Sequence, residues 1–141
     1  DNKTWWGMPG ALQGAVWLAV PGAAPKGTDP VAHLDAAAQL SEAAGVRLAR
    51  ALQIEALRGA GKPQEMRAAI QALATSIRNK PSAKRWRLLD NYAAQIGRHA
   101  SDRVWCSEKG YRAPTGDFGE LPAAKPTEED DDDDAFGDDS E

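Results

Sequence analysis

Apolar residues recur at intervals of three and four along three segments of the chain, which is the spacing of one face of an α-helix. The first segment begins at Asp29-Pro30, where Asp29 can cap a helix and Pro30 suits its first turn, and we expect one helix over 30–58. Two further helices are expected over 63–79 and 81–105. Because the connections are short, neighbouring helices should be antiparallel. The pattern therefore predicts an all-α fold, a small antiparallel three-helix bundle.

One glycine interrupts the longest of these segments. Gly45 lies near the middle of the helix expected over 30–58, where glycine costs about 1 kcal/mol relative to alanine. We expect this cost to be offset because the missing side chain lets another backbone approach closely.

Residues 1–28 lack the helical period and are rich in glycine, proline and tryptophan. We expect an irregular N-terminal arm that contains a short helix or strand. The arm holds three of the five tryptophans, Trp5, Trp6 and Trp17, and such large apolar surfaces need cover from the protein itself or from a partner. These three residues are candidate partner contacts. The apolar run 11–20 is shorter than the roughly 20 residues that cross a bilayer, so no membrane contact is predicted.

Composition divides the chain into four parts: the arm 1–28, a helical core 29–106, a linker 107–127 and an acidic tail 128–141. The linker holds six prolines and glycines and has no apolar period. The net charge of the whole chain is -4, but residues 1–116 carry +7 and the remainder carries -11. A dense acidic run repels itself, so we expect the tail to be disordered on its own.

The reactive side chains do not have the spacing of a catalytic or metal site. Cys106 is the single cysteine, which excludes an intramolecular disulfide and a multi-cysteine zinc site. His99 and Asp102 lie one helical turn apart, but no nucleophile completes a triad. His33 has no second histidine or cysteine at metal-ligand spacing. We therefore expect a protein that is not an enzyme and that holds neither a cofactor nor a metal.

The strongest functional signal is a group of cations around the break before the third expected helix and along that helix. Its members are Lys80, Lys84, Arg85, Arg87, Arg98 and Arg103. Trp86 and Tyr92 are interleaved with them, and nucleic-acid surfaces pair cations for phosphate with aromatic planes for bases. We predict that these six cations contact nucleic acid, although the apolar period also allows Trp86 to face the core.

A second cationic strip follows from the spacing along the first two expected helices. It consists of Arg47, Arg50, Arg58 and Arg67. The spacing allows the first three to share one face, so this strip is an alternative contact for an acidic partner. Charge alone does not indicate which of the two groups of cations contacts a partner.

One aromatic residue lies among the carboxylates of the tail. The run from Asp130 to Asp134 and Phe136 resembles the acidic, Phe-tipped C-termini of bacterial and phage single-stranded-DNA-binding proteins, in which the Phe docks in a partner pocket and the carboxylates meet basic residues. The resemblance covers 128–141 only. Here Phe136 is followed by five further residues, and a helical body differs from the β-barrel of that family. The resemblance implies a docking tail, with partner contacts at Asp130, Asp131, Asp132, Asp133, Asp134 and Phe136.

Two function classes fit these observations. The leading hypothesis is a nucleic-acid-associated accessory protein of the mobile-element or phage type, whose tail docks on a protein partner or regulates binding. The alternative is a structural or assembly protein, such as a virion component, an adaptor or a chaperone, in which the arm and the tail contact other subunits. A third idea is an inhibitor whose tail imitates a phosphate backbone. We expect the protein in the cytoplasm or in a virion, and the start at Asp1 suggests a processed or longer parent chain.

Overall fold

The computed structural model describes residues 3–116 and 118–124, which form five α-helices, one short 3-10 helix and no strand. The helices are α1 (Met8–Ala19), α2 (Pro30–Ala43), α3 (Leu48–Gly59), α4 (Pro63–Asn79) and α5 (Arg87–Lys109), and η1 (Lys84–Trp86) precedes α5. The all-α class is confirmed, but this part of the chain has five α-helices where three were expected. The acidic tail 128–141 lies outside the described residues, so its predicted disorder stays a prediction.

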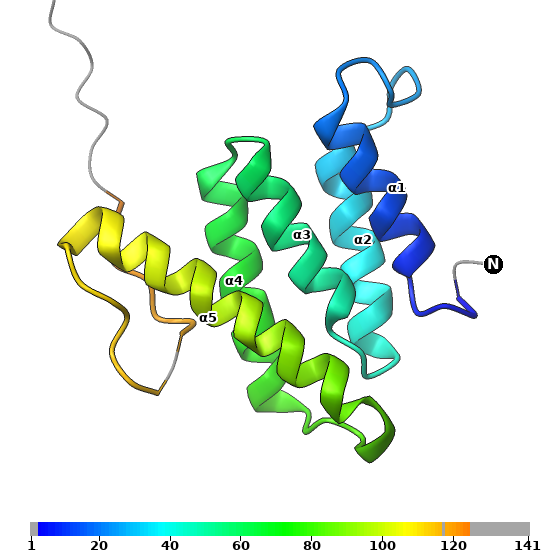
Figure 1. Ribbon diagram of the computed structural model, residues 1–141. Coiled ribbons are helices and arrows are strands. Elements are labelled where there is room, and N and C mark those ends of the chain that lie inside the picture. Colours follow the sequence, from blue (N-terminus) through cyan, green and yellow to red (C-terminus); the bar gives the residue numbers. More distant parts are fainter. Residues whose placement is uncertain (1–2, 117, 125–141) are drawn as a thin grey trace, which may run out of the picture.

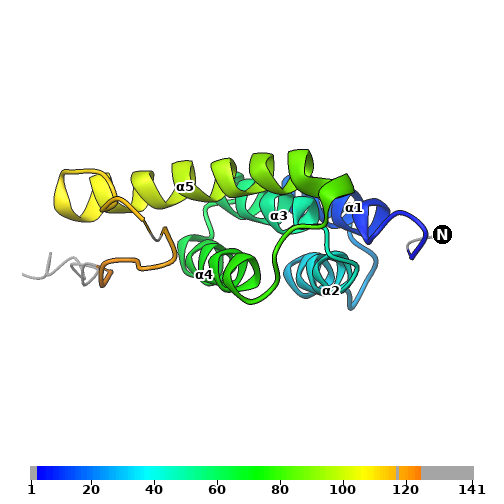
Figure 2. The same cartoon turned by 90° about the horizontal axis from the view of Figure 1, so that it is seen from below.

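Helix α3 lies at the centre of the fold and packs against α1, α2, α4 and α5. Figure 1 shows α1 and α2 as one antiparallel pair, α3 and α4 as the next pair, and α5 crossing over the second pair. Figure 2 shows α2 and α4 on one side of the molecule and α5 on the opposite side. No helix within residues 3–116 and 118–124 is long and apolar enough to cross a membrane.

The N-terminal arm contains a regular helix of 12 residues, α1, where a short helix or strand within irregular backbone was expected. Pro9 lies in its first turn, where a missing N–H breaks no helical hydrogen bond. Gly10 and Gly14 are buried, and a Cβ on Gly14 would lie only 2.8 Å from Cγ of Leu34 on α2. The glycines that indicated irregular chain instead allow α1 to pack closely against α2.

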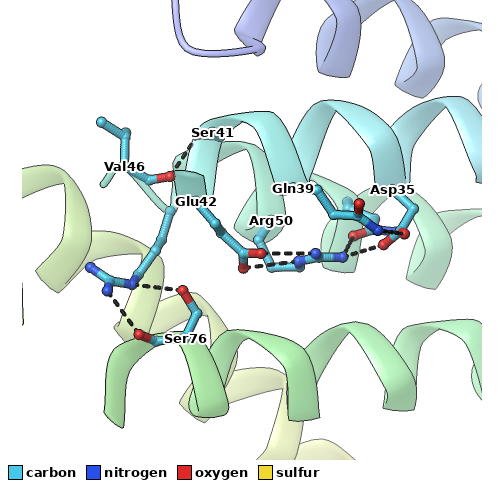
Figure 3. Close-up of polar contacts among 9 residues, drawn as sticks. Asp35, Gln39, Ser41, Glu42, Val46, Arg50 and Ser76 are labelled. Carbon is cyan, nitrogen blue, oxygen red and sulfur yellow. Dashed lines mark hydrogen bonds and ion pairs between the residues drawn. The ribbon is translucent and has the colours of Figure 1, made fainter. Parts of the chain in front are cut away.

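The single helix expected over 30–58 is two helices, because the chain turns at Gly45. Its φ of 82° is left-handed, a conformation that glycine adopts without strain. Within 4 Å, a Cβ at this position would meet only the end of the Lys80 side chain, so the expected close approach of another backbone is wrong. The buried Ser41 hydroxyl donates a hydrogen bond of 2.6 Å to the carbonyl oxygen of Val46 across the turn (Figure 3).

Another glycine, Gly7, allows the start of α1 to approach the backbone of α2 closely. Gly7 has a φ of 77°, and a Cβ there would overlap the backbone carbonyl of Ala37. We expect Gly7→Ala to lower the free energy of unfolding by about 2–5 kcal/mol, from left-handed strain and overpacking together. Gly22→Ala is the matched control, because Gly22 has a φ of 79° and open space around it. Urea unfolding of both variants separates the two effects, and equal losses would contradict the packing of Gly7 on Ala37.

The segment after α5, which was expected to be part of a linker, packs back against the helices (orange in Figure 1). Phe118 is only 8% exposed and joins the core cluster of α3, α4 and α5. Gly97 makes room for it, since a Cβ there would lie 2.7 Å from the Phe118 ring. The indole N–H of Trp105 donates to the carbonyl oxygen of Glu120 at 2.9 Å. The part of this segment around Phe118 therefore packs on the folded body.

Candidate nucleic-acid interface

A buried ion pair fixes the corner at which α4 passes into α5. The guanidinium of Arg47, at the start of α3, lies 2.5 Å from the carboxylate of Asp90 on α5, and the two side chains are 1% and 2% exposed. Asp90 also accepts the backbone N–H of Arg47 at 3.0 Å. The same guanidinium donates to the hydroxyl and carbonyl oxygens of Ser76 and to the carbonyl oxygen of Lys80, at the end of α4. Helices α3, α4 and α5 are thereby joined at one point.

Four of the six predicted cations lie at this corner, and all four are exposed. We call them the basic corner: Lys80, Lys84, Arg85 and Arg87. No acidic residue occurs between Glu65 and Asp90 in the sequence, and Asp90 is paired with Arg47. Lys80 also donates to the carbonyl oxygen of Ala43 at 3.3 Å. The other three cations make no ion pair among the described residues, so the corner keeps its positive charge.

The start of the N-terminal arm lies against the same corner and adds aromatic rings to it. The rings of Trp6 and Trp86 pack edge to face with centroids 4.2 Å apart, and Trp5 lies 6.2 Å from Trp6. The guanidinium of Arg85 lies 5.1 Å from the centre of the Trp86 ring. Trp86 is therefore half-buried beneath Trp6 and Arg85, whereas Trp5 is 59% exposed. We call Trp5, Trp6 and Trp86 the aromatic cluster.

The remaining two predicted cations lie farther along α5. A rise of 1.5 Å per residue places Arg98 about 16 Å and Arg103 about 24 Å from Arg87, and the two are about 140° apart around the helix. Arg98 lies 6.0 Å from the centre of the Phe118 ring. Arg103 lines a cavity on the other flank of α5. The structure thus gathers four of the six residues and separates the other two.

The second cationic strip is not a continuous surface, because Arg47 and Arg50 are buried ion-pair partners. Arg50 lies 3.0 Å from Glu42 and 2.5 Å from Asp35, both on α2 (Figure 3). The expected shared face is therefore wrong for these two arginines, whose charges are neutralised between α2, α3 and α5. A periodicity of cations alone does not reveal which of them meet carboxylates inside the fold.

Arg50 also lowers the pKa of the Asp35 carboxyl group. Burial of Asp35 opposes its charged form, but hydrogen bonds from Arg50, Gln53 and Gln39 and the charge of Arg50 outweigh burial, so its pKa lies below the ordinary 3.8. A carboxyl group with a lowered pKa stabilises the fold above its unfolded pKa, and this contribution disappears as pH falls through the folded value. We expect Asp35→Asn to be less stable than the wild type at pH 7, and the difference in stability to shrink as pH falls below 3.8 towards the lowered pKa of Asp35. Urea midpoints at pH 7 and over a series of acidic pH values test this, and a constant difference would contradict it.

The three arm tryptophans proposed as partner contacts differ in their surroundings. Trp5 is exposed, Trp6 packs on Trp86, and the Trp17 ring lies 4.7 Å from the ring of His33. A different set of apolar residues is exposed on α1 and at the residue that follows it, each by about half: Leu12, Val16 and Val20. Their spacing of four was visible in the sequence, but the surrounding glycines and prolines indicated irregular chain.

His99, Asp102 and Cys106 line one open hollow of about 320 Å³ together with Arg103 and Arg112. No group of three or more histidine, cysteine, aspartate or glutamate residues gathers as a metal site within the described ranges. Absence of enzymatic activity and of cofactors stays a prediction. The tail contacts predicted at Asp130 to Asp134 and Phe136 lie outside the described residues.

Comparisons with protein-family models, with curated proteins and with solved structures find no match for this chain.

Proposed function

We propose that the protein is a non-enzymatic, nucleic-acid-associated accessory protein that binds its ligand at the basic corner. The observation behind this proposal is that four exposed cations lie at one corner, where Arg85 lies over Trp86 of the aromatic cluster, which joins the arm to η1. Cations bind phosphate and release counterions, while aromatic rings stack on bases. The association with mobile elements or phages stays a prediction from the sequence.

The exposed rings favour a single-stranded ligand. More than half of the surface of Trp5 is exposed, and so is that of Tyr92 on α5. Bases in a duplex are already stacked, so aromatic platforms act mainly on unpaired bases. We expect the corner to bind single strands more tightly than duplexes of equal length.

The acidic tail supports a regulatory step within this proposal. Residues 117–141 carry -11, against +7 on residues 1–116. Carboxylates attracted to the cations of the body compete with phosphate, and this competition weakens as salt rises. The tail would thereby reduce the affinity for weakly bound nucleic acid or dock on a protein partner.

A titration of the full chain with labelled single- and double-stranded oligonucleotides over a salt series tests the proposal. Four phosphate contacts at about -0.7 each predict a slope near -3 in a plot of log affinity against log salt concentration for single strands. Tryptophan fluorescence should be quenched as Trp5 stacks on a base. Absence of binding at low salt, or an affinity that does not change with salt, would contradict a phosphate-binding corner.

The exposed face of α1 supports a second candidate function, assembly of several copies of the chain. Leu12, Val16 and Val20 form an apolar stripe, and no charged residue occurs between Lys3 and Lys26 to repel a second copy. We expect Leu12→Gln/Val16→Gln to convert oligomers to monomers in sedimentation velocity. A wild-type chain that stays monomeric at high protein concentration would contradict this candidate.

A further inference from the structure

A cavity of about 200 Å³ opens where the end of α3, the start of α4 and the second half of α5 meet. Apolar lining comes from Met66 and from the buried side chains of Ala100 and Val104. Three arginines and one glutamate also line it: Arg58, Arg67, Arg103 and Glu108. An apolar hollow among guanidinium groups fits an apolar side chain that is flanked by carboxylates.

The positive charge around this cavity is only partly neutralised. Arg58 pairs with Glu55 one turn earlier on α3 at 2.6 Å, and both side chains are exposed. Arg67 lies 3.8 Å from Glu108, and Arg103 makes no ion pair among the described residues. Exposed pairs within one helix contribute little free energy, so incoming carboxylates can exchange with Glu55 at small cost.

The last described residues of the chain lie beside this cavity. The carbonyl oxygen of Pro122 accepts a hydrogen bond from the guanidinium of Arg67, so the last described residues lie beside the cavity lining. From Ala124 to Phe136 the chain has 12 residues, which reach about 40 Å when extended. That length is ample for a return to a cavity that lies next to the starting point.

We infer that the cavity binds the acidic tail of its own chain, with the ring of Phe136 in the apolar hollow and the run of aspartates against Arg58 and Arg103. The ring and the flanking carboxylates match the two kinds of surface that line the cavity. This inference goes beyond the proposed function and does not depend on it, because the basic corner lies about 24 Å away along α5. A docked tail would cover Arg103 and leave the corner open, so competition with phosphate at the corner would require release of the tail from the cavity.

Amide spectra of the full chain, recorded by NMR without nucleic acid, test the inference. Phe136→Ala should shift the amides of Ala100, Arg103 and Ser107, whereas the control Ala135→Ser should leave them unchanged. Arg58→Gln/Arg103→Gln should shift the amides of the tail. If Phe136→Ala shifts only amides within the tail, the inference is wrong.

Dilution distinguishes docking of the tail on its own chain from docking on a second copy. For an intramolecular contact, the shifts caused by Phe136→Ala stay the same when the protein is diluted tenfold. Shifts that disappear on dilution would overturn docking on the own chain and indicate exchange of tails between copies. Failure of oligonucleotide binding would leave these spectra unaffected, so the inference and the proposed function fail independently.

Discussion

Asp90→Asn is expected to lower the free energy of unfolding by about 3–5 kcal/mol, because it leaves the charge of Arg47 buried without a counter-ion. Arg47 is 1% exposed and Asp90 is 2% exposed, so water cannot take over the role of the lost carboxylate. The hydrogen bonds of Arg47 to Ser76 and Lys80 hold the end of α4. Loss of the ion pair should therefore also loosen the basic corner.

Urea unfolding measures this loss of free energy of unfolding, and two further variants show what causes it. Asp102→Asn makes the same substitution on the same helix at a half-buried position, where we expect less than about 1 kcal/mol. Arg47→Met/Asp90→Leu removes both charges, and replacing a buried pair by apolar residues often restores stability. Asp90→Asn with a stability within 1 kcal/mol of the wild type would contradict the account of the corner.

The largest effect on binding is expected from Lys84→Gln/Arg85→Gln/Arg87→Gln. Removing three phosphate contacts at about 0.7 each reduces the slope of log affinity against log salt concentration by about 2. When the affinities of the variant and the wild type are equal at 1 M salt, the variant binds roughly 100-fold more weakly at 0.1 M salt. Because all three side chains are exposed, the fold should be unaffected. Oligonucleotide titrations at four or more salt concentrations give both quantities.

A charge-matched variant shows whether position matters in addition to net charge. Lys26→Gln/Lys62→Gln/Lys109→Gln also removes three exposed or half-exposed cations. Lys62 precedes α4 at the end opposite the corner, and Lys109 is the last residue of α5. We expect a change of less than about threefold, since charges beyond a Debye length of about 10 Å at 0.1 M salt are screened. Equal losses in both variants would mean that only the overall field attracts the nucleic acid.

Local signals in the sequence predicted some elements well. Helix α4 begins at Pro63 and ends at Asn79, as expected from the proline at its start and the Asn-Lys-Pro break after it. The start of α2 is also as expected, with the Asp29 carboxylate accepting the N–H of Val31 at 2.9 Å. The turn at Gly45 was missed because the apolar period continues across it. Helix α1 was expected only as a short helix or strand without bounds, because its glycines serve packing against α2, which only the tertiary structure reveals.

The candidate site was predictable only where local sequence signals indicate it. The exposure of the four corner cations follows from local charge and from the break before α5. The contact between Trp6 and Trp86 joins residues far apart in the sequence, so no local pattern indicated it. The burial of Arg47 depends on Asp90, and the cavity next to Arg103 depends on three helices meeting.

Photochemical crosslinking tests most directly whether the basic corner binds nucleic acid. A single-stranded oligonucleotide with photoreactive pyrimidines is irradiated with the full chain at low salt, and the crosslinked peptides are identified by mass spectrometry. We predict crosslinks at Trp5 and within 84–87, with loss of both signals in moderate salt. Crosslinks confined to residues around Lys26 or Lys62, or spread evenly over the exposed cations, would contradict binding at the corner.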